Sequence, residues 1–194
     1  VNYFRKNSSL ARDGYPALTE YYRKKDGFLQ NSLRLSALER YQSFAPLFEK
    51  YGQEYHFPSL LLAALAYQES ELDSARINQN GNIGIMGLDR SALLREGLED
   101  DAIKLQRPEE NIRTAARYLR FLLDHYFSSP ELSEADQNLM TLAAYRAGTE
   151  QVMTARKKAA LAGYNPDIWF KHVAGVMRLE FEDDRDMQDI AQYV

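Results

Sequence analysis

The residue with the clearest chemical potential is Glu69, which lies at the end of a strongly apolar stretch. Residues 60–67 are all apolar or aromatic, and Gln68, Glu69 and Ser70 follow directly. A helix that is apolar on every side belongs in a protein interior, where a charge is costly. Burial disfavours the charged form of a carboxyl and raises its pKa. Such a group suits general-acid work, as in protonation of a glycosidic oxygen, although a glutamate at a helix end is also an ordinary solvated residue.

Most glycosidases need a second carboxylate, and the nearest acids in the chain are Glu71 and Asp73. Glu71 would point to a different helix face from Glu69. Asp73, four positions after Glu69, would share its face only if the helix continued that far. Residues 71–75 look like the start of a loop, so we expect both acids to be solvated.

Residues 78–87 read as a shaped loop. They contain an Asn-Gly turn signal at Asn80 and Gly81 and three glycines at intervals of three. A phosphate-binding loop is rejected, because the segment lacks the G-x-x-x-x-G-K pattern and follows no predicted strand.

Composition excludes several classes of protein and site. The 194 residues carry a formal net charge of −4, which argues against a nucleic-acid partner held by phosphate contacts. There are no cysteines, so disulfides, zinc–thiolate sites and cysteine nucleophiles are excluded. His56, His125 and His172 lack metal-ligand spacing, and we expect packing or surface roles rather than a metal site. The uncharged, strongly apolar run of residues 57–68 is too short to span a bilayer.

The pattern of apolar residues and turn signals predicts an all-α domain over residues 36–194, after a lead-in or linker from a preceding domain over residues 1–35. No convincing alternation of apolar and polar residues predicts a strand. The expected helices run from Ser36 to about Gly52, from Pro58 to Ser70, from Asp89 to Glu96, from Pro108 to Ser128, from Ser133 to Gly148, from Thr149 to Gly163, and onward from Asn165 and Pro166.

Three segments of the chain resemble a known family. Residues 67–70 (Tyr-Gln-Glu-Ser), 84–88 (Gly-Ile-Met-Gly-Leu) and 143–148 (Ala-Ala-Tyr-Arg-Ala-Gly) are similar to the three signatures of the soluble-lytic-transglycosylase (SLT) catalytic domain. They occur in the family's order and at plausible separations, and the resemblance covers about residues 38–194. It implies a lysozyme-like helical fold of the goose-type lysozyme and SLT architecture.

The resemblance also implies an activity that needs no cofactor and no metal. Such domains cleave the bond between N-acetylmuramic acid and N-acetylglucosamine in peptidoglycan. Glu69 would protonate the leaving oxygen and then accept the proton of the muramyl C6 hydroxyl, which closes a 1,6-anhydro ring. The second carboxylate is then unnecessary, because the attacking group belongs to the substrate.

By the same resemblance, Ser70 would orient Glu69 or the substrate, Met86 would line the sugar cleft, and Tyr145 would place its hydroxyl near Glu69. The partners would be peptidoglycan glycan strands. Because that polymer lies outside the cytoplasmic membrane, the expected location is the periplasm or cell envelope of a bacterium, with any membrane attachment through a part outside this chain.

Two positions depart from the family pattern. Gly87 stands where the family usually has a glutamine or a bulky residue, and Arg146 follows Tyr145 where it usually has an asparagine. A cation beside Glu69 would lower the pKa of its carboxyl, unless Arg146 points away or grips an anionic substrate group. Three alternatives stay open: a weak or inactive peptidoglycan-binding module, a hydrolytic lysozyme that uses Asp73, and a helical interaction scaffold.

Overall fold

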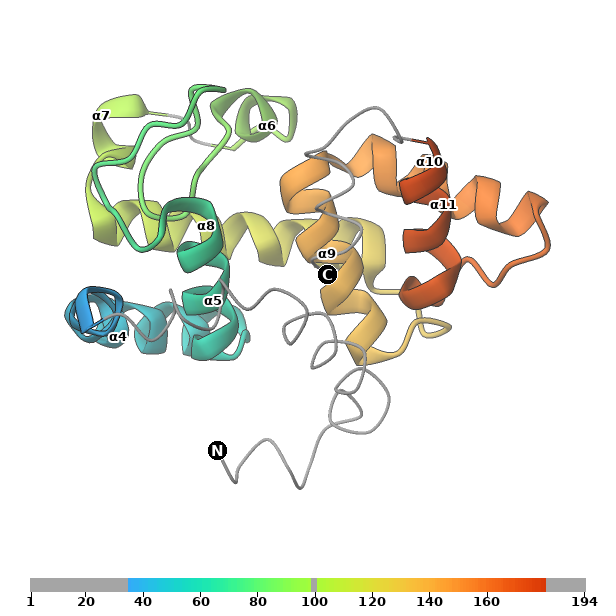
Figure 1. Ribbon diagram of the computed structural model, residues 1–194, viewed down its shortest axis with the longest axis horizontal. Coiled ribbons are helices and arrows are strands. Elements are labelled where there is room, and N and C mark those ends of the chain that lie inside the picture. Colours follow the sequence, from blue (N-terminus) through green and yellow to red (C-terminus); the bar gives the residue numbers. More distant parts are fainter. Residues whose placement is uncertain (1–34, 99–100, 181–194) are drawn as a thin grey trace, which may run out of the picture. The chain divides into compact units, whose positions relative to one another are not determined.

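The computed structural model of the protein describes residues 35–98 and 101–180 (Figure 1). These residues form two compact units, a first unit of residues 35–120 and a second unit of residues 121–180. The expected lead-in over residues 1–35 lies, apart from Leu35, outside the described residues.

Helices make up the regular structure of both units. In chain order, the first unit contains α4 (Leu35–Tyr55), α5 (Ser59–Ser70), α6 (Arg90–Arg95), α7 (Ala102–Leu105) and α8 (Pro108–Leu122), whose last two residues pass into the second unit. The second unit contains η2 (Leu123–Phe127), α9 (Glu134–Ala147), α10 (Thr149–Leu161), η3 (Trp169–Val173) and α11 (Ala174–Glu180). Between the described helices, β pairing is limited to isolated bridges. The predicted all-α class is confirmed.

The core of the first unit forms where α5 packs against α4 (Figure 1). Phe48 of α4 and Leu62, Leu65 and Ala66 of α5 are almost completely buried. Each large apolar side chain buried in this way stabilises the fold by about 1.5–3 kcal/mol. The expectation that α5 is buried on every side is only partly right, because Leu60 keeps 49% of its surface exposed in the first turn.

The end of α4 differs from the prediction. Gly52 does not stop the helix, which continues to Tyr55 and ends where His56 adopts a left-handed conformation with φ of 60°. Gly52 instead allows a close approach of the chain. Its carbonyl accepts a hydrogen bond of 2.8 Å from the Phe57 N–H, and a Cβ atom at Gly52 would lie 2.7 Å from the Phe57 carbonyl oxygen.

Two predicted helix starts are confirmed by their capping bonds. The Asp89 side chain accepts a bond of 2.8 Å from the Ser91 N–H at the start of α6, and Ser133 caps α9 through the Asp136 N–H at 3.1 Å. The start of α10 is different, because Gly148, with φ of 90°, occupies the cap position instead of Thr149.

The last predicted helix begins later than expected. The Asn165 side chain accepts a bond of 2.8 Å from the Asp167 N–H, which closes a turn instead of starting a helix. The chain then enters the second unit's core at Trp169, which is fully buried and whose backbone N–H donates to Asp136 of α9 at 2.8 Å. Lys171, with φ of 64°, interrupts η3, so that regular helix resumes only with α11.

Candidate active site

Glu69 is the penultimate residue of α5, as the sequence predicts. The helix ends at Ser70 because the next two residues, Glu71 and Leu72, are both left-handed, with φ of 56° and 64°. This conformation is strained for residues other than glycine and concentrates at functional sites. The side chain of Glu69 is partly buried, and its Oε1 atom is shielded from solvent.

A tight turn over residues 84–87 lies against the end of α5. Ile83 and Leu88 exchange two backbone hydrogen bonds of 3.0 Å, and the Gly87 N–H donates to the Gly84 carbonyl at 3.0 Å. Gly84 and Gly87, at the two ends of the turn, have φ of 77° and 58°. Glycine is favoured at both positions because it adopts positive φ without steric penalty.

Two buried side chains hold the middle of this turn. Ser70 of α5 donates its hydroxyl to the Ile85 carbonyl at 2.7 Å, and Asn111 of α8 accepts the Met86 N–H at 2.8 Å. Both side chains are essentially inaccessible to solvent. The turn is therefore fixed to two helices of the first unit through its own peptide groups, which would otherwise be buried without partners.

Gly87 is in direct contact with Glu69. A Cβ atom at Gly87 would lie 2.8 Å from Oε2 of Glu69 and 2.9 Å from its Cβ. The glycine that departs from the family pattern thus makes room for the carboxyl of Glu69, and a side chain at position 87 would displace it.

Three of the predicted site residues lie together in the first unit, and the other two belong to the second unit. Glu69, Ser70 and Met86 meet in the first unit, where the Met86 side chain is fully buried and Ser70 binds main-chain carbonyls. Tyr145 and Arg146 are consecutive residues of α9. Tyr145 is buried and Arg146 is partly exposed.

The other acids near Glu69 are exposed, and two of the histidines pack against aromatic rings. Glu71 and Asp73 are exposed, and Asp73 accepts a hydrogen bond of 3.0 Å from the Ala75 N–H in the turn after α5. The ring of His125 stacks on Phe121, and His172 packs edge-on against Tyr164. Within residues 35–98 and 101–180, no cluster of His, Cys, Asp or Glu could hold a metal ion, and no helix is long and apolar enough to cross a membrane.

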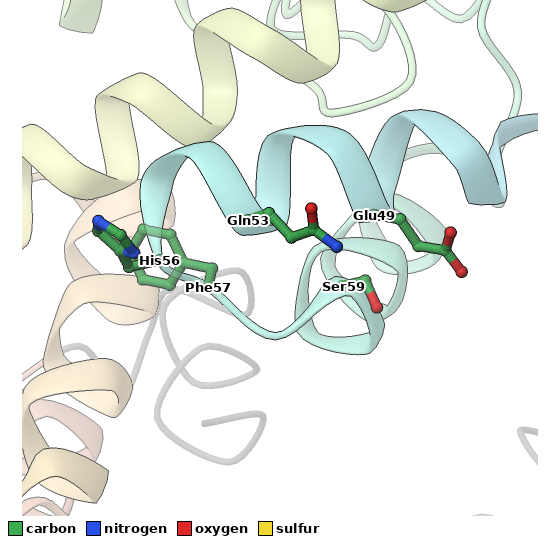
Figure 2. Close-up of a pocket in the computed structure, with 6 residues that line it drawn as sticks. Glu49, Gln53, His56, Phe57 and Ser59 are labelled. Carbon is green, nitrogen blue, oxygen red and sulfur yellow. The ribbon is translucent and has the colours of Figure 1, made fainter.

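The hollow shown in Figure 2 lies apart from Glu69 within the first unit. It is bordered by Glu49 and Gln53 of α4, by His56 and Phe57 after that helix, and by Ser59 at the start of α5 (Figure 2). Glu69 is at the opposite end of α5 from Ser59. We therefore do not assign the chemistry to this hollow.

A charged contact links α4 and α8 in the first unit. The Lys50 ammonium and the Tyr51 hydroxyl both donate to Oε1 of Glu109, at 2.7 and 2.9 Å. The bond from Lys50, followed by the bond from Tyr51, holds the pKa of Glu109 below its ordinary value of 4.5. The same bond raises the pKa of Lys50.

This contact predicts an acid-sensitive contribution to stability. Because the pKa of Glu109 is lower in the folded than in the unfolded state, the contact stabilises the fold above pH 4.5, and this stabilisation is lost as the pH falls through the folded-state value. We expect the free energy of unfolding to fall less steeply below pH 5 in Glu109→Gln than in the wild type. Urea denaturation at a series of pH values measures this. Lys50→Met should flatten the slope too, whereas equal slopes in all three proteins would contradict the assignment. Both charged groups are half exposed, so added salt should weaken the effect.

Comparison with known proteins identifies the family. The profile of the family described as "Transglycosylase SLT domain" matches residues 46–168, well over half of the chain. The chain belongs to the transglycosylase SLT domain family. Its lysozyme-like helical fold, expected from the sequence, is confirmed.

Three curated relatives of this SLT domain have closely similar names. The chain is 34% identical over 168 residues to "Membrane-bound lytic murein transglycosylase F" of Yersinia enterocolitica, an alignment that covers 84% of the chain and 33% of the relative. The protein of that name from Marinobacter nauticus is 36% identical over 68% of the chain and 24% of its own length. "Membrane-bound lytic murein transglycosylase F 2" of Alkalilimnicola ehrlichii is 37% identical over 69% of the chain and 28% of its own length. The chain thus spans between a quarter and a third of the length of these relatives.

Proposed function

We propose that this SLT domain is a peptidoglycan lytic transglycosylase, which cleaves the bond between N-acetylmuramic acid and N-acetylglucosamine and leaves 1,6-anhydro ends. The observation that carries the proposal is the position of Glu69. Its partly buried carboxyl, at the end of the apolar helix α5, rests against the backbone of Gly87. Glu69 and Gly87 belong to two of the segments that resemble the family's signatures.

The reaction needs one carboxyl in two protonation states. In the first step Glu69 gives its proton to the glycosidic oxygen, and the bond from this oxygen to C1 of the muramyl residue breaks. In the second step the carboxylate accepts the proton of the C6 hydroxyl while the oxygen of that hydroxyl bonds to C1. Glu69 thereby regains its acid form, and the protons balance. Neither step uses a water nucleophile, so the solvated Glu71 and Asp73 need no role.

The remaining site residues have supporting roles in this proposal. Ser70 holds the turn that borders Glu69 through the Ile85 carbonyl. Met86 is fully buried, so it supports the turn beside Glu69 from the core instead of lining the sugar cleft. The supporting role of Tyr145 stays a prediction. Arg146 either points away from Glu69 or binds an anionic group of the substrate, since an arginine that faced Glu69 directly would lower the pKa required of a general acid.

The proposed partner and location follow from the substrate. Peptidoglycan glycan strands are the partner. Because this polymer lies outside the cytoplasmic membrane, the domain acts in the bacterial cell envelope, in the periplasm. The name of two relatives, "Membrane-bound lytic murein transglycosylase F", agrees with an envelope location.

Product analysis tests the function. Purified, insoluble peptidoglycan is incubated with the chain, and the released muropeptides are identified by mass spectrometry while the polymer-bound protein is measured by sedimentation. We expect fragments with 1,6-anhydromuramyl ends. Fragments with reducing ends would indicate a hydrolytic lysozyme instead. Binding to the polymer without release of fragments would indicate an inactive peptidoglycan-binding module. The absence of both binding and release would indicate a helical interaction scaffold.

A further inference from the structure

Asn111 is a fully bonded, buried side chain of the first unit that the predicted site did not include. It has no solvent exposure. Its Oδ1 accepts the Met86 N–H at 2.8 Å, and its Nδ2 donates to the Ile83 carbonyl at 2.9 Å and to the Leu105 carbonyl at 2.8 Å. Both amide hydrogens and the amide oxygen are therefore used. An asparagine is one of the few side chains with donors and an acceptor in this arrangement.

These bonds connect α8 with the turn that borders Glu69. Ile83 forms the base of the turn and Met86 its third residue, and Met86 directly precedes Gly87. The turn packs tightly against Asn111 at Gly84 and against Glu69 at Gly87. A Cβ atom at Gly84 would overlap the Asn111 amide, and a Cβ atom at Gly87 would overlap Glu69. A shift of the turn away from Asn111 would thus move the backbone against which the Glu69 carboxyl rests.

We propose that Asn111 is a positioning residue for Glu69, which acts by fixing the Gly84–Gly87 turn and through it the wall beside the carboxyl. The role in turnover rests on the proposed transglycosylase function, whereas the geometric role does not. Ser70 secures the Ile85 carbonyl from α5, but it is adjacent to Glu69 in the same helix. Asn111 ties the turn to a different helix.

The test compares two variants in which an apolar side chain of nearly the same size replaces a buried polar one. Asn111→Leu removes all three bonds, and Thr141→Val removes the bond of a fully buried hydroxyl on α9 in the second unit. The carboxyl carbons of glutamate are labelled with ¹³C, and the Glu69 resonance is identified by its absence in Glu69→Gln. We expect Asn111→Leu to change the chemical shift and the pH midpoint of this resonance, and Thr141→Val to leave both unchanged.

Turnover gives the second readout. In folded Asn111→Leu, release of muropeptides per polymer-bound enzyme should fall roughly 10- to 100-fold, the effect of a catalytic group misplaced by about 1 Å. Polymer binding should stay near that of the wild type, because Asn111 is not exposed to substrate. A merely structural role would lower thermal stability without moving the Glu69 resonance.

A second variant decides the matter if Asn111→Leu does not fold. Gly84→Ala presses on the Asn111 amide from the turn, while Gly81→Ala introduces the same methyl at a positive φ with open space around it. The Glu69 resonance should move in Gly84→Ala and not in Gly81→Ala. An unchanged Glu69 resonance in folded Asn111→Leu, or in Gly84→Ala, overturns the proposal. A wild type that releases no muropeptides, together with a resonance that moves as expected, would reject the function and keep the positioning role.

Discussion

Replacing Glu69 with glutamine is expected to reduce the release of muropeptides by about 10²- to 10⁴-fold, the usual contribution of a general acid–base group. The amide has nearly the size of the carboxyl, so it fits against Gly87 but has no proton of suitable acidity to give. Sedimentation with insoluble peptidoglycan should show unchanged binding, and thermal denaturation should show little change in Tm. The measurement is the initial rate of muropeptide release, divided by the amount of bound protein.

The neighbouring acids supply matched controls for this substitution. Glu71→Gln and Asp73→Asn each remove one exposed carboxylate within four residues of Glu69. Both variants should release muropeptides at the rate of the wild type. If Asp73→Asn lost as much activity as Glu69→Gln, a two-carboxylate hydrolase would replace the single-carboxylate mechanism.

Gly87→Ala is expected to impair both stability and activity, because the added methyl has no place to go. Its position would be 2.8 Å from Oε2 and 2.9 Å from Cβ of Glu69. The carboxylate end of the side chain could swing aside, but Cβ is fixed to the backbone of α5. We expect the free energy of unfolding to fall by about 1–2 kcal/mol because of the left-handed conformation and by about 1–3 kcal/mol because of the overpacking. Activity should fall at least about 10-fold through displacement of Glu69.

Gly81→Ala separates these two effects. Gly81 has φ of 81°, and an added Cβ atom would have nothing within 4 Å, so the variant carries the backbone penalty without the clash. Urea denaturation should show a smaller loss of stability than in Gly87→Ala, and turnover should be retained. Equal turnover in the two variants would show that the space beside Glu69 is not required.

The position of Glu69 could be predicted because local signals define the end of α5. The apolar run, the polar residues that follow it and the glycine spacing of the next loop are all readable within about 30 residues. The caps at Asp89 and Ser133 could be predicted for the same reason, since a side chain that bonds the second or third N–H of a helix acts within one turn.

The role of Asn111 depends on contacts between residues distant in the chain. Its bonds to Ile83 and Met86 cross 28 and 25 residues, and such contacts leave no local signal. The sequence does contain one clue. Asn111 lies on the same helix face as Ala115, Tyr118 and Leu122, which are all buried. A polar residue within an apolar stripe indicates a buried group that must find partners.

The role of Gly52 in α4 also depends on a tertiary contact that leaves no local signal in the sequence. A glycine after an amphipathic run usually marks a helix end, and here the helix continues for three more residues. A glycine stands here because the Phe57 carbonyl approaches its backbone closely, and helix propensity does not contain such a tertiary contact. The left-handed pair of Glu71 and Leu72 was likewise not predictable, because neither residue favours positive φ.

Digestion of peptidoglycan in H₂¹⁸O asks whether Glu69 acts without a water nucleophile, on which the proposed mechanism depends. We expect wild-type fragments to end in 1,6-anhydromuramic acid and to contain no ¹⁸O from the solvent. Glu69→Gln should release almost none of them. Fragments with reducing ends that each carry one ¹⁸O atom would contradict the mechanism and would show that water attacks C1.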